Sequence, residues 1–282
     1  MTCAAKNIPN TGWSNLDIDI MHNGLGVEQK MLCKPSKKSI SEYCGTRQMH
    51  PSATRSIRIP SKNGDPTEIA RDVLSQYAKL INERRNKVAE NTPDVVPDIR
   101  TGWLLWQTSL REFLYFEEEM LSPNPLDFWA EWKKSGGGSR KKSVNLWVYE
   151  KESGRKRYSI TTEAGAKIQP YFDIPPPNDP NLFIFTVQGE LIGNGLVRIW
   201  VTSTTTLFLK HLIGNLNTET LSNAITKAAQ GAVEVQEEST SRRIEEAFPL
   251  ILTQEAYDLL CQTFQGISDE YRIQLLLQYL QT

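Results

Sequence analysis

Residues 16–32 read Leu-Asp-Ile-Asp-Ile-Met-His-Asn-Gly-Leu-Gly-Val-Glu-Gln-Lys-Met-Leu. On both sides of Asn23-Gly24, apolar residues alternate with charged or polar ones, and a period of two is typical of a half-buried strand. Asn-Gly is a strong signal for a two-residue hairpin turn, because both residues tolerate the positive φ that this turn needs. We therefore expect an antiparallel β-hairpin over this stretch.

The expected turn fixes which charged residues share a face of the hairpin. It places Asp19 opposite Glu28 and Asp17 opposite Lys30. Two carboxylates that face each other on a sheet repel, and a divalent cation removes the conflict. Carboxylate oxygens at this density suit Mg²⁺. The pattern predicts Mg²⁺ on Asp19 and Glu28, with Lys30 serving the attacking water and Asp17 orienting Lys30 through an ion pair.

The two aspartates, followed by Gly26-Val27-Glu28-Gln29-Lys30, resemble the catalytic hairpin of the PD-(D/E)xK nuclease superfamily, the fold of most type II restriction endonucleases. The resemblance implies that Asp19 (or Asp17) and the acidic residue Glu28 ligate the metal while Lys30 serves the water. The pattern departs from the family in two ways. No proline precedes either aspartate, and only about 15 residues lie upstream, where the family usually has a helix that can carry another acidic ligand.

The same resemblance implies an overall fold and a function. We expect an α/β, restriction endonuclease-like mixed β-sheet flanked by helices, with a helical C-terminal segment. The expected activity is Mg²⁺-dependent hydrolysis of phosphodiester bonds in double-stranded DNA, as in a type II site-specific deoxyribonuclease. A homodimer with one active site for each strand, and a cognate DNA methyltransferase that acts on the same site, would be its partners.

Two structural alternatives to this active site remain open from the residues alone. The first hairpin can be an ordinary solvated element. A second Glu-x-Lys triplet, Glu131-Trp132-Lys133, lies downstream of Pro97-Asp98. We expect a short helix over residues 126–132, because the aromatic residues there follow helical spacing, and such a helix would not carry the catalytic geometry.

Composition limits the classes of function. The chain has 282 residues and a net charge of −1, so it can form one large domain or two smaller ones and has no global basic field to attract nucleic acid. The four cysteines form no Cys-x-x-Cys pair and the three histidines are scattered, which gives no indication of a zinc site. Neither a signal peptide nor a membrane span is indicated, so we expect a cytoplasmic protein without membrane association.

DNA would then be held by local basic patches. We expect these in the polar segment 33–64, in the glycine-rich stretch 133–142, and at the tip of a second hairpin, which is predicted from strands at 144–150 and 156–161. The cations that these segments contribute are the predicted DNA contacts, namely Arg47, Arg55, Arg58, Lys133, Lys134, Arg140, Lys141, Lys142, Arg155, Lys156 and Arg157.

The rest of the chain alternates helices and strands. Asp65-Pro66 is typical of a helix start, and apolar spacing continues that helix to about Val88. Strands are expected at 103–107, 110–116, 167–174, 182–188 and 197–201, with the hydroxyl run 202–206 as a strand edge. Three C-terminal helices are predicted, with caps at Asn217, Thr253 and Ser268. We expect a nuclease domain with DNA-contacting loops over residues 1–215, and a helical segment over 216–282 that belongs to the same domain.

A rival function from a different class is a non-catalytic nucleic-acid-binding or assembly protein. In that case the basic tips would bind the nucleic acid and the acidic hairpin would be structural. Nucleotide binding is not indicated, because Gly193-Asn194-Gly195 lacks the third glycine and the following helix of a phosphate-binding motif. Metal-dependent DNA cleavage separates the enzyme from the binder.

Overall fold

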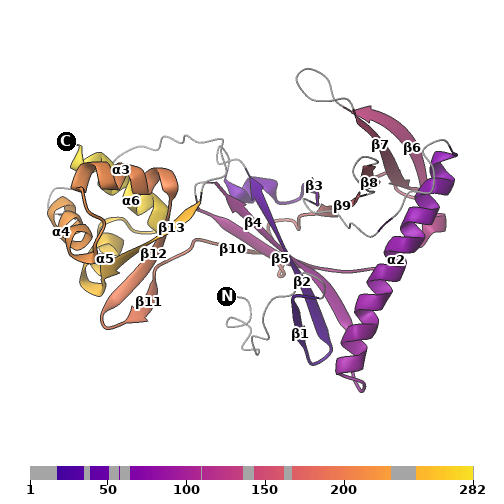
Figure 1. Ribbon diagram of the computed structural model, residues 1–282, viewed down its shortest axis with the longest axis horizontal. Helices are drawn as coiled ribbons and strands as arrows, with labels where there is room; N and C mark the ends of the chain where they lie inside the picture. Colours follow the sequence, from indigo (N-terminus) through magenta and orange to yellow (C-terminus); the bar gives the residue numbers. More distant parts are fainter. Residues whose placement is uncertain are drawn as a thin grey trace. The chain divides into compact units, whose positions relative to one another are not determined.

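The computed structural model describes residues 18–34, 39–50, 57, 64–108, 110–135, 143–161, 167–229 and 246–281 (Figure 1). The predictions made for Asp17, Arg55, Arg58 and the run 140–142 lie outside these residues. The fold is mixed α/β, as expected, with three sheets within the described ranges. The chain divides into two compact units, one of Met1–Leu32, Cys44–Trp103 and Phe116–Leu182, the other of Cys33–Tyr43, Leu104–Tyr115 and Phe183–Thr282.

The first sheet contains the predicted hairpin. Its strand order is β1 (Ile20–His22), β2 (Leu25–Lys34), β4 (Asp98–Gln107), β5 (Phe113–Glu119) and β10 (Phe183–Phe185). Ile20 pairs with Val27 and His22 with Leu25, so the predicted register of the hairpin is confirmed. Asn23 and Gly24 have φ values of 45° and 79°, which are those of the expected type I′ turn.

Strands β2 and β4 are parallel. Asp98 N donates to Gly24 O at 2.9 Å and Thr108 N donates to Lys34 O at 3.4 Å. Because both bonds join residues with the same sequence offset, the two strands run in the same direction. Parallel neighbours need a crossover connection, and here helix α2 (Pro66–Asn91) lies in the connection. The hydrogen bonds between β4 and β5 run in the antiparallel sense, so the sheet is mixed.

Helix α2 begins where the sequence indicates, with Asp65 Oδ1 accepting a hydrogen bond from Glu68 N at 3.0 Å. Its two halves pack on different sheets of unit 1. The first half contributes Ile69, Ala70, Val73 and Leu74 to a core shared with the second sheet. The second half contributes Ile81 and Val88 to a smaller core under the hairpin and β4. Helix α2 therefore packs both on the sheet that contains the hairpin and on the second sheet.

The second sheet is antiparallel and lies in unit 1, where Figure 1 shows α2 alongside it. Its order is β3 (Arg47–Met49), β9 (Lys167–Asp173), β8 (Lys156–Thr161), β7 (Ser143–Glu150) and β6 (Phe128–Ser135). The predicted hairpin of 144–150 and 156–161 is confirmed as β7 and β8. Between β2 and β3 in the chain, residues Ile40–Tyr43 form a short 3₁₀ turn, η1.

The prediction of a helix over residues 126–132 is wrong. A 3₁₀ turn, η2 (Pro125–Asp127), is followed at Phe128 by strand β6. Phe128 and Ala130 point into the core shared with α2, whereas Trp129 and Glu131 alternate with them on the other face. The side chains therefore alternate with a period of two, as in a strand. The sequence pattern did not show this alternation because both faces of β6 carry bulky aromatic residues.

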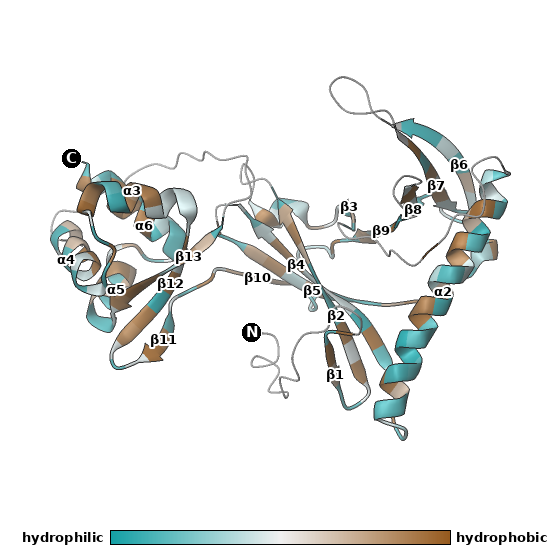
Figure 2. Cartoon of the chain, in the orientation of Figure 1, coloured by the Kyte–Doolittle hydropathy of each residue, from teal (hydrophilic) through white to brown (hydrophobic). Residues whose placement is uncertain are grey.

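Unit 2 holds the third sheet, of β11 (Glu190–Gly193), β12 (Leu196–Thr202) and β13 (Ala247–Thr253). One core joins β12 and β13 to helices α3 (Ser203–Ile213), α4 (Thr218–Ala229), α5 (Gln254–Thr263) and α6 (Asp269–Leu280). Figure 2 shows brown and teal positions alternating around these helices, as expected for amphipathic helices. The predicted caps Asn217, Thr253 and Ser268 each accept a hydrogen bond from an amide of the helix that follows. None of the helices among the described residues has both the length and the apolar character that crossing a bilayer requires.

The prediction of a strand edge over residues 202–206 is also wrong. Thr202 ends β12 and caps α3, because its Oγ1 accepts a hydrogen bond from Thr205 N at 3.3 Å. The cap is buried, and Glu270 of α6 accepts hydrogen bonds from Thr202 N and from both threonine hydroxyls. A hydroxyl run that suited a strand by composition is used for capping a helix.

Candidate active site

Glu28 lies at the centre of the predicted site and is almost completely buried. Its side chain is 11% exposed, and its carboxylate is ion-paired with Lys30 of the same strand and with Arg84 of α2. Lys30 and Arg84 are more open, at 23% and 33% exposed. The site thus has a buried acidic centre with cations that reach solvent.

The sequence around Glu28 allows helix α2 to approach closely. A Cβ on Gly26 would lie 2.6 Å from Val88 Cγ2 of α2 and 3.0 Å from Ile18 Cδ1, so only glycine fits there without displacement. Arg84 lies one turn from Ile81 and one from Val88 on the same side of the helix. The helix face that buries apolar residues against β2 therefore also presents a guanidinium to Glu28.

Asp19 lies beside Glu28 and Lys30, just before β1 begins. Its Oδ2 accepts a hydrogen bond from Gln29 N at 2.7 Å, across the hairpin. Burial raises the pKa of Asp19 above its ordinary value, and the charge of Glu28 raises it further, while the Gln29 bond and the charges of Lys30 and Arg84 lower it. The predicted residues Asp19, Glu28 and Lys30 are therefore brought together, and Arg84 joins them.

Two carboxylates fit the chemistry of Mg²⁺, which is commonly held by one or two of them, with waters and substrate phosphate oxygens completing the shell. Within the described residues, no three side chains of His, Cys, Asp or Glu form a group that could hold a metal ion. Asp19 and Glu28 are therefore the candidate ligands, and a third protein ligand is not required by this cation.

Glu118 of β5 is a further acidic residue that was not predicted from the sequence. It lies in the buried row between Phe116 and Met120, and Trp103 Nε1 donates to its carboxylate at 3.4 Å. Burial raises its pKa. The signal was available in the sequence, because every second residue of a strand points to the same face and Phe116 and Met120 are both apolar.

Three predicted DNA contacts converge on one carboxylate of the second sheet. Arg47 binds Asp173 with both Nε and Nη2, at 2.8 and 2.9 Å, and Arg155 and Arg157 approach it at 3.2 and 3.5 Å. The hydrogen bond from Arg47 lowers the pKa of Asp173. Three guanidinium groups share this carboxylate, although the half-buried Glu118 adds a second negative charge in their surroundings.

The second Glu-x-Lys triplet also lies on a strand, β6, and Lys133 pairs with Glu131 at 3.1 Å. Lys133 and Lys134 are thus strand residues and not part of a glycine-rich loop. Glu131 is 35% exposed and accepts a hydrogen bond from Tyr149 Oη at 2.8 Å. The proposed upstream partner Asp98 instead pairs with Arg100 at 2.6 Å. The two triplets therefore differ in burial and in their neighbours, not in secondary structure.

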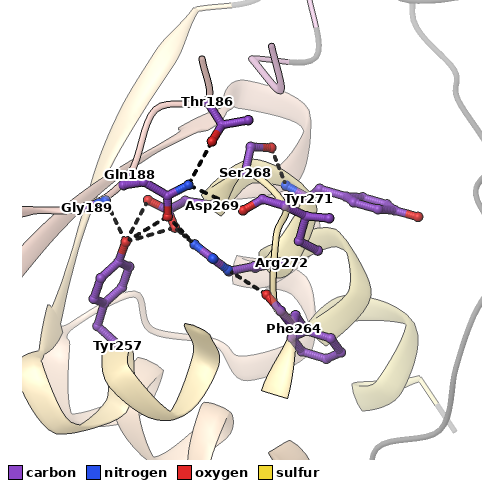
Figure 3. Close-up of polar contacts among 10 residues, drawn as sticks. Thr186, Gln188, Gly189, Tyr257, Phe264, Ser268, Asp269, Tyr271 and Arg272 are labelled. Atoms are coloured by element: carbon purple, nitrogen blue, oxygen red, sulfur yellow. Dashed lines mark hydrogen bonds and ion pairs between the residues drawn. The ribbon is translucent and has the colours of Figure 1, made fainter. Parts of the chain in front are cut away.

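A different polar cluster lies in unit 2, around Asp269 and Arg272 of α6 (Figure 3). Arg272 Nη1 donates to Asp269 at 2.7 Å and to Gln188 at 2.6 Å, and Tyr257 Oη donates to Asp269 at 3.2 Å. The Asp269 and Arg272 side chains are 3% and 6% exposed. Their hydrogen bonds are made within the unit, which is the arrangement of a structural network.

Comparisons with protein-family models, with curated proteins and with solved structures found no match to this chain.

Proposed function

We propose that the chain is a Mg²⁺-dependent endonuclease that hydrolyses phosphodiester bonds in double-stranded DNA, of the type II restriction kind. One observation carries the proposal. Glu28 and Lys30 lie two residues apart on one face of β2, are paired with each other, and have Asp19 beside them across a two-residue turn. An acid pair next to an ammonium is the side-chain set that the PD-(D/E)xK resemblance implies.

The surrounding fold supports the restriction endonuclease-like assignment. The strand that carries Glu28 and Lys30 is an inner strand of a mixed sheet, with α2 packed on it through Val88 and Ile81. A helix that follows the catalytic hairpin and packs on its sheet is what the resemblance implies. Inner strands and a packed helix hold side chains more rigidly than loops do, which favours a catalytic constellation.

The side chains divide the work as follows. Asp19 and Glu28 would hold the Mg²⁺ ion, which supplies Lewis-acid charge at the phosphate and a nucleophilic water at neutral pH. Lys30 places an ammonium beside Glu28, where it stabilises the negative charge that develops on the phosphate under attack. Arg84 is a positioning residue, because it fixes the Glu28 carboxylate from the helix side.

Cutting both strands of a duplex needs two such sites, so the proposed enzyme acts as a homodimer. A restriction enzyme must also leave its own genome uncut, so a cognate DNA methyltransferase of the same specificity belongs to the proposal.

The test is cleavage of a supercoiled plasmid by the purified full chain with Mg²⁺. We expect discrete fragments, and none when EDTA removes the metal. Glu28→Gln and Lys30→Ala should abolish cleavage. The matched control is Glu131→Gln, which breaks the second Glu-x-Lys pair and should cleave like the wild type.

Three outcomes would contradict the proposal. Wild-type cleavage by Lys30→Ala would remove the hairpin from consideration, and loss of cleavage in the Glu131 variant alone would move the site to β6. A plasmid that is shifted in a gel but stays intact under all metal conditions would favour the non-catalytic binding protein.

A further inference from the structure

The two faces of the second sheet are unequally buried among the described residues. One face packs on α2 through Leu146, Val148, Ile160 and Ile168. Trp129, Trp147, Tyr149 and Tyr171 alternate with the core residues and face the other way. Lys156 joins them because a register shift in β7 and β8 places it opposite Tyr149. The uncovered face of an antiparallel sheet usually carries polar side chains. Four aromatic rings on such a face therefore point to a ligand.

The rings on this face form two groups. Trp129 and Tyr149 are directly opposite in the ladder, and their rings stack with centroids 4.4 Å apart and planes 13° apart. Trp129 remains 39% exposed. Lys156 Nζ lies 3.4 Å from the centre of the Trp147 ring and 4.9 Å from that of Tyr171. The face thus has one exposed ring stack and one ammonium that contacts two further rings.

The charge on this face favours an anionic ligand, since its carboxylate Glu131 is already paired with Lys133. Lys156 forms no ion pair with a carboxylate of the described residues, and burial alone lowers its pKa to about 8. At the edge of the face, Asp173 is shared by the three arginines described above. A half-buried ammonium without a carboxylate gains most from a bound anion such as a phosphodiester.

Proteins bind single-stranded nucleic acid with aromatic rings on which bases stack and with cations that follow the backbone. In a duplex the ring faces of the bases are covered by their neighbours, so only unpaired bases can stack on a protein ring. We propose that this face binds single-stranded nucleic acid, with unpaired bases stacked on Trp129 and Tyr149 and a backbone phosphate on Lys156. The proposal goes beyond the nuclease function, because binding here needs neither Glu28 nor Mg²⁺.

The experiment is fluorescence anisotropy of a labelled dT oligonucleotide of about 12 nucleotides, with the full chain in EDTA so that cleavage plays no part. Trp129→Ala should weaken binding by about 5-fold or more, the usual effect of losing one stacked base. Trp129→Phe keeps a ring and should restore most of the affinity. Lys156→Gln should reduce the slope of log affinity against log salt by about 0.7, the value for one phosphate contact on a single strand.

Phe208→Ala is the matched control, since Phe208 is an aromatic residue of α3 that is 53% exposed. It should leave binding unchanged. Equal affinity in all variants would overturn the proposal, as would preference for a duplex of the same sequence or for a neutral oligosaccharide. If dT binding fails while the plasmid is cut, only this proposal falls; if dT binds and the plasmid stays intact, only the nuclease proposal falls.

Discussion

Two pairs of acidic residues in this molecule have opposite surroundings. In unit 2, Asp269 and Glu270 are almost fully buried, and Glu270 accepts hydrogen bonds from Thr202 N, two threonine hydroxyls and Gln274 Nε2. In unit 1, Glu28 is also buried, but its partners are two cations that reach solvent. Asp269 and Glu270 are therefore enclosed by protein groups. Glu28, with Asp19 beside it, instead lies next to cations that are partly exposed to solvent.

The difference shows how acids of the same type can serve different purposes. A buried carboxylate whose donors are all internal can only stabilise or specify the fold. A carboxylate whose partners are long, half-exposed cations can exchange them for a ligand without unfolding. We therefore expect substitutions in the first pair to change stability and those in the second to change activity.

The largest effect should come from Lys30→Met. It removes the ammonium but keeps the length of the side chain, and we expect the single-turnover cleavage rate to fall by about 10²- to 10⁴-fold. The midpoint of urea unfolding and the affinity for DNA should change little, because Lys30 is one cation among many. A large loss of stability with normal turnover would place Lys30 with the structural residues and end the comparison.

The next effect should be on stability, in unit 2. Glu270→Ala removes the acceptor of four hydrogen bonds, three of them from buried threonine groups, and should lower the free energy of unfolding by about 3 kcal/mol or more. Glu270→Gln should cost less, because the threonine hydroxyls can turn to accept from its amide group. Urea unfolding of both variants measures the two costs. Equal costs would show that charge, not hydrogen bonding, decides the stability of this network.

A smaller effect tests how closely α2 must approach the site. Gly26→Ala forces apart β2 and Val88, and should cost about 1–3 kcal/mol of stability while also lowering cleavage, since Arg84 moves with the helix. Gly64→Ala is the control, because its Cβ would meet only the flexible end of Ile69, at 3.3 Å. Thermal unfolding and plasmid cleavage of both variants separate the effects. Unchanged cleavage by Gly26→Ala would mean that Arg84 does not position Glu28.

The smallest effect concerns pH. Asp19 must be ionised to hold Mg²⁺, and its raised pKa places the acid limb of activity above the ordinary range of an aspartate. The charge of Arg84 lowers this pKa, so Arg84→Met should raise it and move the acid limb to higher pH. Arg71→Met, on the same helix but paired with Glu68, should leave the profile in place. Saturating Mg²⁺ should move the limb to lower pH in both variants.

The hairpin could be predicted because its determinants are local. Alternation of side chains and an Asn-Gly turn specify strand, register and face within 17 residues. Helix caps such as Asp65 and Thr253 are equally local, and they were predicted correctly. The metal ion, the DNA and the dimer remain predictions, since they depend on molecules outside the chain.

Other features depend on contacts between distant segments. Arg84 could not be assigned to the site from its sequence neighbours, because its role depends on which face of α2 lies on β2. The convergence of Arg47, Arg155 and Arg157 on Asp173 likewise depends on the pairing of β3 with β9. At residues 128–132, aromatic side chains on both faces removed the contrast that distinguishes a strand from a helix.

The parallel pairing of β2 with β4 sets an order of events during synthesis. The hairpin can close as soon as residues 18–34 leave the ribosome, because its contacts are local. Arg84 and the covering strand β4 arrive later, and the sheet cannot take up β4 before α2 has turned the chain back. A nascent or truncated chain that ends before Gln107 would carry Glu28 and Lys30 on an incompletely covered strand. The acidic site is thus completed only after Arg84 and β4 have been made, later than the hairpin that carries Glu28 and Lys30.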